Sequence, residues 1–357
     1  MRSALILSLA AALATTTLSV SCTSDDPIAS GDIKGNSIKF GVSTDYLRSS
    51  KMTDNILKEF HVYAYNNNAA TPYIDNLAIR KTDGNEWQST SSVYWPSNGS
   101  LSFYAFAPGD LVDHDPREPN YYDTFADSNP ATTDLLYAVN RDMTAPGAKV
   151  GLNFRHALSK VAVKMMSGNS NLIVNVSNVI INGVNSRGNF HFPEANTSDY
   201  PAPENTGTWT DQNTPKTLVL HQAKSADQIL TLSSTATDLG DLGLGNHGAK
   251  FVIPQTLNQT NENGNEAYIG VMCLIYDANT GEKLWPNANT SDENMVNGSA
   301  FGDGLLKFPL SSSLISEWYP GYHYIYNLII DSNEDTASLE FVAPTVDSYV
   351  EVTSTYE

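Results

Sequence analysis

The chain has 357 residues, with 39 acidic against 20 basic side chains and a net charge of −19 at pH 7. A surface this acidic repels phosphate backbones and anionic lipid head groups, so we expect no nucleic-acid partner. The length exceeds what one hydrophobic core usually serves, and 18 tyrosines with only 17% charged residues are typical of an extracellular β-protein.

The first residues have the features of a secretory signal. Arg2 supplies a positive charge, an apolar stretch covers residues 4–18, and small residues precede Cys22. This stretch is too short to span a membrane, and we expect residues 1–21 to be a removed lipoprotein signal peptide. The ending Leu-Ser-Val-Ser-Cys at 18–22 resembles the lipobox of bacterial lipoproteins, with serine at residue 19 where leucine is usual. Cys22 would then carry the lipid; an ordinary secretory signal with an incidental cysteine is the other interpretation.

A polar segment with Pro and Gly, residues 22–36, follows and predicts a flexible tether. Its acids Asp25 and Asp26 are similar to the signal that sends lipoproteins of the Bacteroidetes to the outer face of the cell. The pattern therefore predicts a surface-exposed protein of the outer membrane. Cys273 is the remaining cysteine, and we expect it to pack in the core without a disulfide.

Short runs with period-two alternation dominate the rest of the chain. Phe60, Val62 and Ala64 alternate with polar or tyrosine side chains, and residues 101–107 repeat the pattern, so both runs predict half-buried strands. Turn-rich stretches separate further runs of this kind, which indicates sandwiches or barrels rather than βαβ units. Pro146 and Gly147 interrupt two strand-rich blocks. We expect one β-sandwich domain at 37–147 and a second at 148–357.

Motifs that carry catalytic or cofactor chemistry are not apparent. The pattern G-x-G-x-x-G at 243–248 lacks the preceding buried strand and the following helix that a dinucleotide site needs, so it predicts a loop. The seven histidines show no metal-binding spacing, and the acids near His114 lack the regular spacing of a calcium loop. We therefore expect no cofactor, no metal and no enzymatic activity; a sandwich glycosidase is the enzyme alternative.

Tyrosines 322, 324 and 326 alternate on one run, with Trp318 just upstream. Such a row can stack on sugars, but it more often packs against an opposite sheet, and we favour packing. A monomeric surface lipoprotein that binds glycans through exposed aromatics is the alternative function.

Several segments, in this order, resemble the fimbrillin family of the Bacteroidetes, the Mfa-like and FimA-like subunits of type V pili. They are SVYWPSNGSLSFYAFAP at 92–108, TDLLYA at 133–138, LNFRHALSKVAVKM at 152–165, FVIPQT at 251–256 and EWYPGYHYIYNLII at 317–330. The resemblance implies an all-β fold of two tandem β-sandwich domains with transthyretin-like Greek-key topology.

The resemblance also implies how such subunits polymerise. A trypsin-like protease cuts after a basic residue near the start of the first domain and removes the lipidated N-terminal strand, and a C-terminal strand of the next subunit fills the groove. Arg48 matches the cleavage position, just after the strand predicted at 37–42. The donor strand would lie in 337–357, with its plug residues among Val346, Tyr349, Val350 and Val352; residues 339 and 341 could instead belong to the last strand of the second sandwich. We therefore expect a structural fimbrial subunit whose partners are other subunits, the protease and the outer membrane, with a further role in adhesion.

Overall fold

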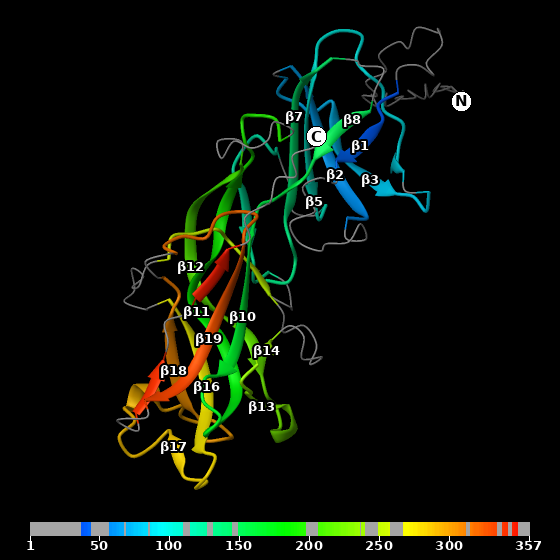
Figure 1. The fold of residues 1–357 in the computed structure, drawn as a ribbon. Coiled ribbons are helices and arrows are strands. Elements are labelled where there is room, and N and C mark those ends of the chain that lie inside the picture. The colour runs from blue at the N-terminus through cyan, green and yellow to red at the C-terminus, as the bar shows by residue number, and fades with distance from the viewer. Residues whose placement is uncertain are drawn as a thin grey trace, which may run out of the picture. The chain divides into compact units, whose positions relative to one another are not determined.

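The computed structural model describes residues 37–43, 57–67, 69–84, 86–109, 115–126, 131–144, 149–197, 206–235, 237–239, 249–257, 267–311, 315–333, 338–341 and 345–348. They all belong to one compact unit, Asn36–Glu357. Four sheets make up almost all of its regular structure (Figure 1). Among the described residues, none forms a helix that is long and apolar enough to cross a membrane.

Two sheets come mainly from the first part of the chain. Sheet I is a six-stranded antiparallel sheet in the order β4 (Trp87–Ser89), β3 (Ile74–Lys81), β2 (Glu59–Asn66), β5 (Leu101–Ala107), β7 (Leu136–Met143) and β9 (Arg155–His156). Sheet II pairs β1 (Phe40–Ser43) with β8 (Val150–Asn153) in parallel.

The other two sheets form the second part of the chain. Sheet III has the order β12 (Thr208–Gln222), β11 (Leu172–His191), β16 (Tyr268–Asp277) and β17 (Lys283–Trp285), with β13 (Leu230–Thr231), β18 (Gly304–Pro309) and β6 (Asn120–Asp123) pairing beside them. Sheet IV has the order β14 (Thr237–Asp238), β10 (Ser159–Ser167), β19 (His323–Asn333) and β20 (Ser338–Phe341), with β15 (Lys250–Val252) beside β10 and β21 (Thr345–Ser348) beside β19. Two single turns of 3₁₀ helix, η4 (Ala226–Gln228) and η5 (Asp292–Asn294), lie in the connections.

Each pair of sheets encloses an apolar core, because alternate side chains of every strand point to the same face. Between sheets I and II the core contains Phe60, Val62 and Ala64 from β2 with Val150 and other residues of β8. Between sheets III and IV it contains alternate residues of β10, β11, β16 and β19. The predicted fold class, all-β with two sandwiches, is confirmed.

The second face of sheet I is also buried, and here the prediction of half-buried strands is wrong. Tyr63, Tyr65 and Tyr104 point away from sheet II, yet at most 6% of each is exposed. They belong to a third apolar cluster that includes Phe190 and Phe192, at the end of β11. All seven residues of β5 are buried for this reason.

Polar contacts also join sheet I to the second part of the chain. The indole Nε1 of Trp209, in β12, donates a hydrogen bond to the carbonyl oxygen of Ala157 at 2.8 Å. The hydroxyl oxygen of Tyr137, in β7, accepts a hydrogen bond from the backbone N–H of Gly207 at 2.7 Å. Along the sequence the first core ends at Phe154, and the second core, apart from Ala131, begins at Val161. The division predicted at residues 147 and 148 lies shortly before this change.

Candidate functional site

Backbone hydrogen bonds hold strand β1 on two sides. We take the position that β1 occupies between these partners, called its seat below, as the candidate site. On one side its register with β8 sets Phe40 opposite Val150, and the N–H of Val150 donates to the carbonyl oxygen of Lys39 at 2.7 Å. On the other side the N–H of Ile38 donates to the carbonyl oxygen of Val93 at 2.9 Å. β1 therefore lies between β8 and the segment that precedes β5; Figure 1 shows β1 beside β8.

The side chains of β1 complete the first core. Ile38 and Phe40 are buried, whereas Lys39 between them is exposed. The Phe40 ring meets Phe60 edge to face at 6.5 Å between ring centroids and Phe103 at 6.1 Å. Trp95 also meets Phe103 edge to face, with 5.8 Å between ring centroids. The apolar side chains of this segment therefore pack against the aromatic rings of sheet I.

The sequence predicted part of this seat. Of the strand expected at 37–42, residues 40–42 lie in β1, and Ser37 forms an isolated bridge to Tyr94. The partner strand β8 was missed, although Val150, Leu152 and Phe154 alternate in the sequence and all three are buried. Cys22 and Arg48 lie outside the described residues, as do the glycine pattern at 243–248, Asp113 and His114. Asp115, the other acid near His114, is described and pairs with Arg117.

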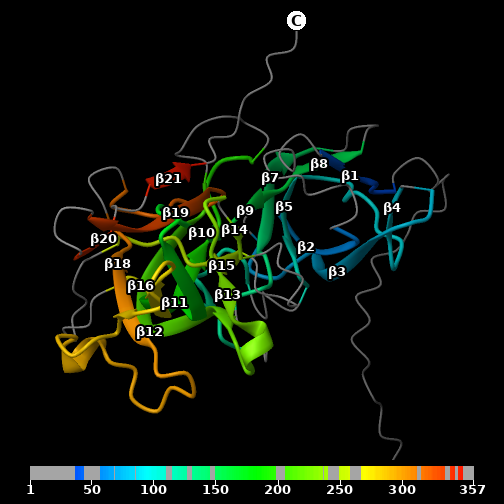
Figure 2. The ribbon, with the colours of Figure 1, turned by 60° about the horizontal axis from the view of Figure 1, so that its bottom comes forward.

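The C-terminal segment lies along β19 of the same chain (Figure 2). Strand β20 pairs antiparallel with the second half of β19, where Ile330 lies opposite Phe341. Strand β21 continues along the first half of β19, where Tyr326 lies opposite Val346. Residues 339 and 341 thus belong to a strand of sheet IV, as one interpretation of the sequence held. The other donor candidates, Tyr349, Val350 and Val352, lie outside the described residues.

Two tyrosines of the aromatic row, Tyr324 and Tyr326, pack inward with Trp318 as the favoured interpretation held, whereas Tyr322, which precedes β19, is only partly buried. Trp318, Tyr324 and Tyr326 are at most 3% exposed. The indole Nε1 of Trp318 donates to the Tyr326 hydroxyl oxygen at 3.0 Å, and that hydroxyl donates to the carbonyl oxygen of Leu310 at 3.0 Å. Burial raises the pKa of Tyr324 to about 12. These three side chains are therefore core residues and cannot form a platform for sugars.

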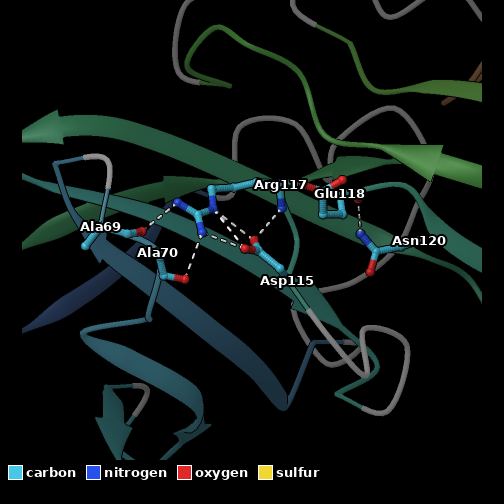
Figure 3. Close-up of polar contacts among 6 residues, drawn as sticks. All are labelled: Ala69, Ala70, Asp115, Arg117, Glu118 and Asn120. Atoms are coloured by element: carbon cyan, nitrogen blue, oxygen red, sulfur yellow. Dashed lines mark hydrogen bonds and ion pairs between the residues drawn. The ribbon is translucent and has the colours of Figure 1, made fainter.

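Arg117, which the sequence did not single out, lies at the surface with its side chain 27% exposed and fixes the chain just before β6 (Figure 3). The Arg117 guanidinium lies 3.6 Å from the centre of the Tyr65 ring. Its nitrogens donate to Asp115 Oδ2 at 2.6 Å, to the Ala69 carbonyl oxygen at 2.9 Å and to the Ala70 carbonyl oxygen at 3.4 Å. Burial acts to raise the pKa of Asp115, but the hydrogen bonds from Arg117 outweigh it and lower that pKa. The pattern is that of a structural clamp between the β2–β3 turn and β6.

The described residues give little support for a metal site or a reactive cysteine. Among those residues no group of three or more His, Cys, Asp or Glu side chains is placed to hold a metal ion. Cys273 is buried in β16, and burial together with the charge of Asp303 raises the pKa of its thiol. A buried protonated thiol is a poor nucleophile.

Comparison with solved structures gives relatives of low identity. A candidate cell adhesion protein from Bacteroides uniformis is 15% identical, with a TM-score of 0.46, 88% of this chain covered and 98% of that one. A fimbrial protein from Bacteroides vulgatus is 14% identical, with a TM-score of 0.46 and coverages of 88% and 100%. The fimbrial anchor protein Mfa2 from Porphyromonas gingivalis is 10% identical, with a TM-score of 0.33 and coverages of 82% and 89%.

Family comparison is more decisive than these structural likenesses, whose TM-scores all lie below 0.5. No curated protein matches the sequence significantly. The family described as fimbrillin-like matches residues 48–346. This range includes most of the chain and confirms the resemblance found in the sequence. The chain belongs to the fimbrillin-like family.

Proposed function

We propose that the protein is a non-enzymatic structural subunit of a cell-surface fimbria that assembles by protease-triggered strand exchange. The observation that carries the proposal is the seat of β1: a short N-terminal strand that fills an aromatic groove and is held there by a four-residue parallel ladder. Parallel pairing is slightly weaker per residue than antiparallel pairing. Such a strand can be both necessary to the fold and replaceable.

Removal of β1 would leave a defined vacancy. The rings of Phe60 and Phe103 would lose the buried Phe40 between them, and the edge of β8 would lose its hydrogen-bonding partner. Exposed apolar grooves and unpaired strand edges bind further strands. A strand from another subunit that supplies both backbone groups and alternating apolar side chains would close the vacancy.

The cut that releases β1 is proposed after Arg48, which follows β1 in the sequence. The strand that replaces β1 is proposed to come from residues 337–357 of a neighbouring subunit, with Val346, Tyr349, Val350 and Val352 as its candidate plug residues. Its first residues form β20 and β21 at the edge of sheet IV, where they pair with β19. A segment at a sheet edge has one pairing partner to leave, so it is suited to transfer.

Export is proposed to run through lipid attached at Cys22, which would hold the precursor in the outer membrane. Asp25 and Asp26 would direct it to the outer face. Because Cys22 precedes Arg48, cleavage would release the anchor from the assembled fimbria. The proposed partners are other fimbrial subunits, a trypsin-like maturation protease and the outer membrane, and the proposed role in adhesion follows from the family.

The test is limited trypsin treatment of a chain that begins at residue 23 and therefore lacks Cys22. We expect a cut after Arg48, identified by the mass of the large fragment, and then oligomers that resist sodium dodecyl sulfate. Arg48→Ala should abolish both the cut and the oligomers. Arg80→Ala is the matched control, since Arg80 is an exposed arginine of β3 that contacts Glu59. Cleavage after Arg48 without oligomers, or equal oligomers from Arg48→Ala, would overturn the proposal.

A further inference from the structure

Three side chains just before β19, those of Glu317, Tyr319 and Tyr322, form a surface cluster that we call the Tyr319 site. Tyr319 is 51% exposed, although its neighbour Trp318 is fully buried. The Tyr319 and Tyr322 rings lie 5.9 Å apart between centroids, with 55° between their planes. The negative charge of Glu317 lies beside the Tyr319 hydroxyl and raises its pKa, and a side-chain hydrogen bond between the two acts in the same direction. An aromatic ring and a carboxylate thus lie together at the surface.

We propose that the Tyr319 site binds the guanidinium of an arginine that a different protein presents. The flat cation would stack on the Tyr319 ring, and its nitrogens would donate to the Glu317 carboxylate. Guanidinium groups stack on aromatic faces, and their planar fork of donors matches a carboxylate. The inference goes beyond strand exchange, since it concerns contact with another protein and uses no residue of the seat of β1.

The chain itself contains a complete example of this arrangement. The Arg117 guanidinium lies 3.6 Å from the centre of the Tyr65 ring and donates to Asp115 Oδ2 at 2.6 Å (Figure 3). Burial raises the pKa of the Tyr65 hydroxyl, and its hydrogen bond with Asp115 raises it further. The unit therefore consists of a tyrosine ring, a carboxylate beside its hydroxyl and a guanidinium over the ring. Tyr319 and Glu317 supply the first two of these groups.

The two tyrosines differ in exposure. The Tyr65 ring, which Arg117 covers, is 2% exposed, whereas Tyr319 is 51% exposed. A cation from outside the chain can therefore reach Tyr319 but not Tyr65.

The backbone that carries Tyr319 is fixed by hydrogen bonds on several sides. Its N–H donates to the Tyr324 hydroxyl oxygen at 2.8 Å, and its carbonyl oxygen accepts from the Ser159 hydroxyl at 2.8 Å. Two residues later, the N–H of Gly321 donates to the Leu158 carbonyl oxygen at 2.9 Å. Gly321 has a φ of +78°, which favours glycine at this turn. A turn held in this way positions Tyr319 before a ligand arrives and so lowers the entropic cost of binding.

Ring contacts support the Tyr319 site from the core side. Tyr322 stacks on Tyr324 with 6.2 Å between centroids and 26° between planes. Tyr324 in turn lies 6.4 Å from Trp318, and both of these are at most 3% exposed. The rings therefore continue the second core to the surface, where Tyr319 is the exposed end.

The arginine is expected from another protein, because the arginines within the described ranges are already engaged. Four of them form ion pairs with acids of the same chain, and the fifth donates to a backbone carbonyl oxygen. These contacts are Arg80 with Glu59, Arg117 with Asp115, Arg141 with Glu194, Arg187 with Asp123, and Arg155 with the carbonyl oxygen of Thr197. Arg48 belongs to the part that the proposed cut removes. The net charge of −19 also favours encounter with a basic partner.

The test uses the tripeptide Gly-Arg-Gly, acetylated and amidated at its ends, and the uncleaved chain that begins at residue 23. Carbon-13-labelled tyrosine rings are followed by NMR, and the signals of Tyr319 and Tyr322 are assigned through their Phe variants. Gly-citrulline-Gly, which is neutral and has nearly the same shape, is the ligand control. We expect saturable shifts of both signals with the arginine tripeptide and none with the citrulline tripeptide.

Replacement of either binding group should weaken this binding. Glu317→Gln and Tyr319→Ala, the second followed on the Tyr322 signal, should each raise the dissociation constant by about two- to thirtyfold. Glu282→Gln and Tyr121→Ala are the matched controls and should bind like the wild type. Glu282 is an exposed acid, so its replacement changes the net charge equally, and Tyr121 is 56% exposed. Glu317→Gln keeps the shape of its side chain, so it tests the proposal even if Tyr319→Ala unfolds.

The contrary outcomes are distinct. Equal shifts with both tripeptides, or equal weakening in Glu282→Gln, would overturn the proposal, because the guanidinium or the position of the acid would then not matter. Saturable shifts of Tyr319 with N-acetyllactosamine and not with the arginine tripeptide would also overturn it and make the site a sugar platform. Since the chain is not cleaved in this test, its failure leaves strand exchange standing, and failure of the trypsin test leaves the Tyr319 site standing.

Discussion

Phe40 and Phe103 meet edge to face, with 6.1 Å between their ring centroids and 84° between their planes. Aromatic pairs prefer this arrangement because the edge of one ring is positive and the face of the other is negative. One ring comes from β1 and the other from β5, at the centre of sheet I. The N-terminal strand is therefore part of the first core.

Truncation of Phe40 should weaken the first sandwich strongly. Phe40→Ala leaves a cavity among aromatic rings and should lower the free energy of unfolding by about 3–5 kcal/mol. Urea unfolding followed by tryptophan fluorescence measures the change. Lys39→Ala, next to it but exposed, should change the free energy by less than about 0.5 kcal/mol. A loss below about 1 kcal/mol for Phe40→Ala would mean that β1 is not packed as described.

Strand β2 shows which part of the burial pattern can be predicted from the sequence and which part cannot. Phe60, Val62 and Ala64 follow a period of two, and this pattern correctly predicts a strand with one face in a core. The pattern also sets Tyr63 and Tyr65 on the other face, but it carries no information about what covers that face. Their neighbours Phe190 and Phe192 come more than 120 residues later in the chain. Tyrosine suits either water or a buried interface, so the sequence alone could not distinguish them.

Only part of the candidate site could be predicted from the sequence, for the same reason. The strand of Phe40 could be predicted because its apolar residues alternate. Its partner strand begins at Val150, directly after Pro146 and Gly147, where turn signals predict a domain boundary. Which strand lies beside β1, and in which direction, depends on pairing over more than 100 residues. Local patterns do not encode such pairing.

Loss of the Arg117 guanidinium should destabilise the chain at neutral pH. Arg117→Ala removes the contact with the Tyr65 ring and the donors to Ala69 and Ala70. It also leaves Asp115 without its ion pair. Because these contacts lie at the surface, where solvent screens them, we expect a loss of only about 1 kcal/mol in urea unfolding at pH 7. Arg80→Ala, whose side chain is 63% exposed, is the control and should have little effect.

The ion pair between Arg117 and Asp115 predicts that the free energy of unfolding depends on pH. In the folded chain the pKa of Asp115 is lowered. Burial acts to raise this pKa, but the hydrogen bonds from Arg117 lower it by more. A lowered pKa contributes stability above the unfolded value of about 3.9, and this contribution is lost as the pH falls through the folded value. The difference in unfolding free energy between wild type and Arg117→Ala should therefore shrink below about pH 4. A constant difference from pH 7 to pH 3 would show that Asp115 is not involved.

A hydrogen bond at the second face of sheet I should be costly to remove. Tyr137→Phe leaves the N–H of Gly207 without the hydroxyl acceptor at 2.7 Å. An unsatisfied buried donor costs about 1–3 kcal/mol, which urea unfolding would detect. Tyr121→Phe is the control, because Tyr121 is 56% exposed and should tolerate the change. Equal stability of the two variants would imply that water reaches Gly207.

The thiol of Cys273 should be inert in the folded protein. Burial, with a further contribution from Asp303, raises its pKa, and the thiolate is the reactive form. In a chain that begins at residue 23, Ellman's reagent should find no reactive thiol at pH 8 and one after unfolding in guanidinium chloride. Lys283→Cys, an exposed position in β17 of the same sheet, should react within minutes and faster as the pH rises from 7 to 9. The native rate of Cys273 should be far lower than that of Lys283→Cys at every pH in that range, since both its access and its ionisation require β16 to separate from its neighbours. Labelling of Cys273 at the rate of Lys283→Cys would show that the second core is open at β16.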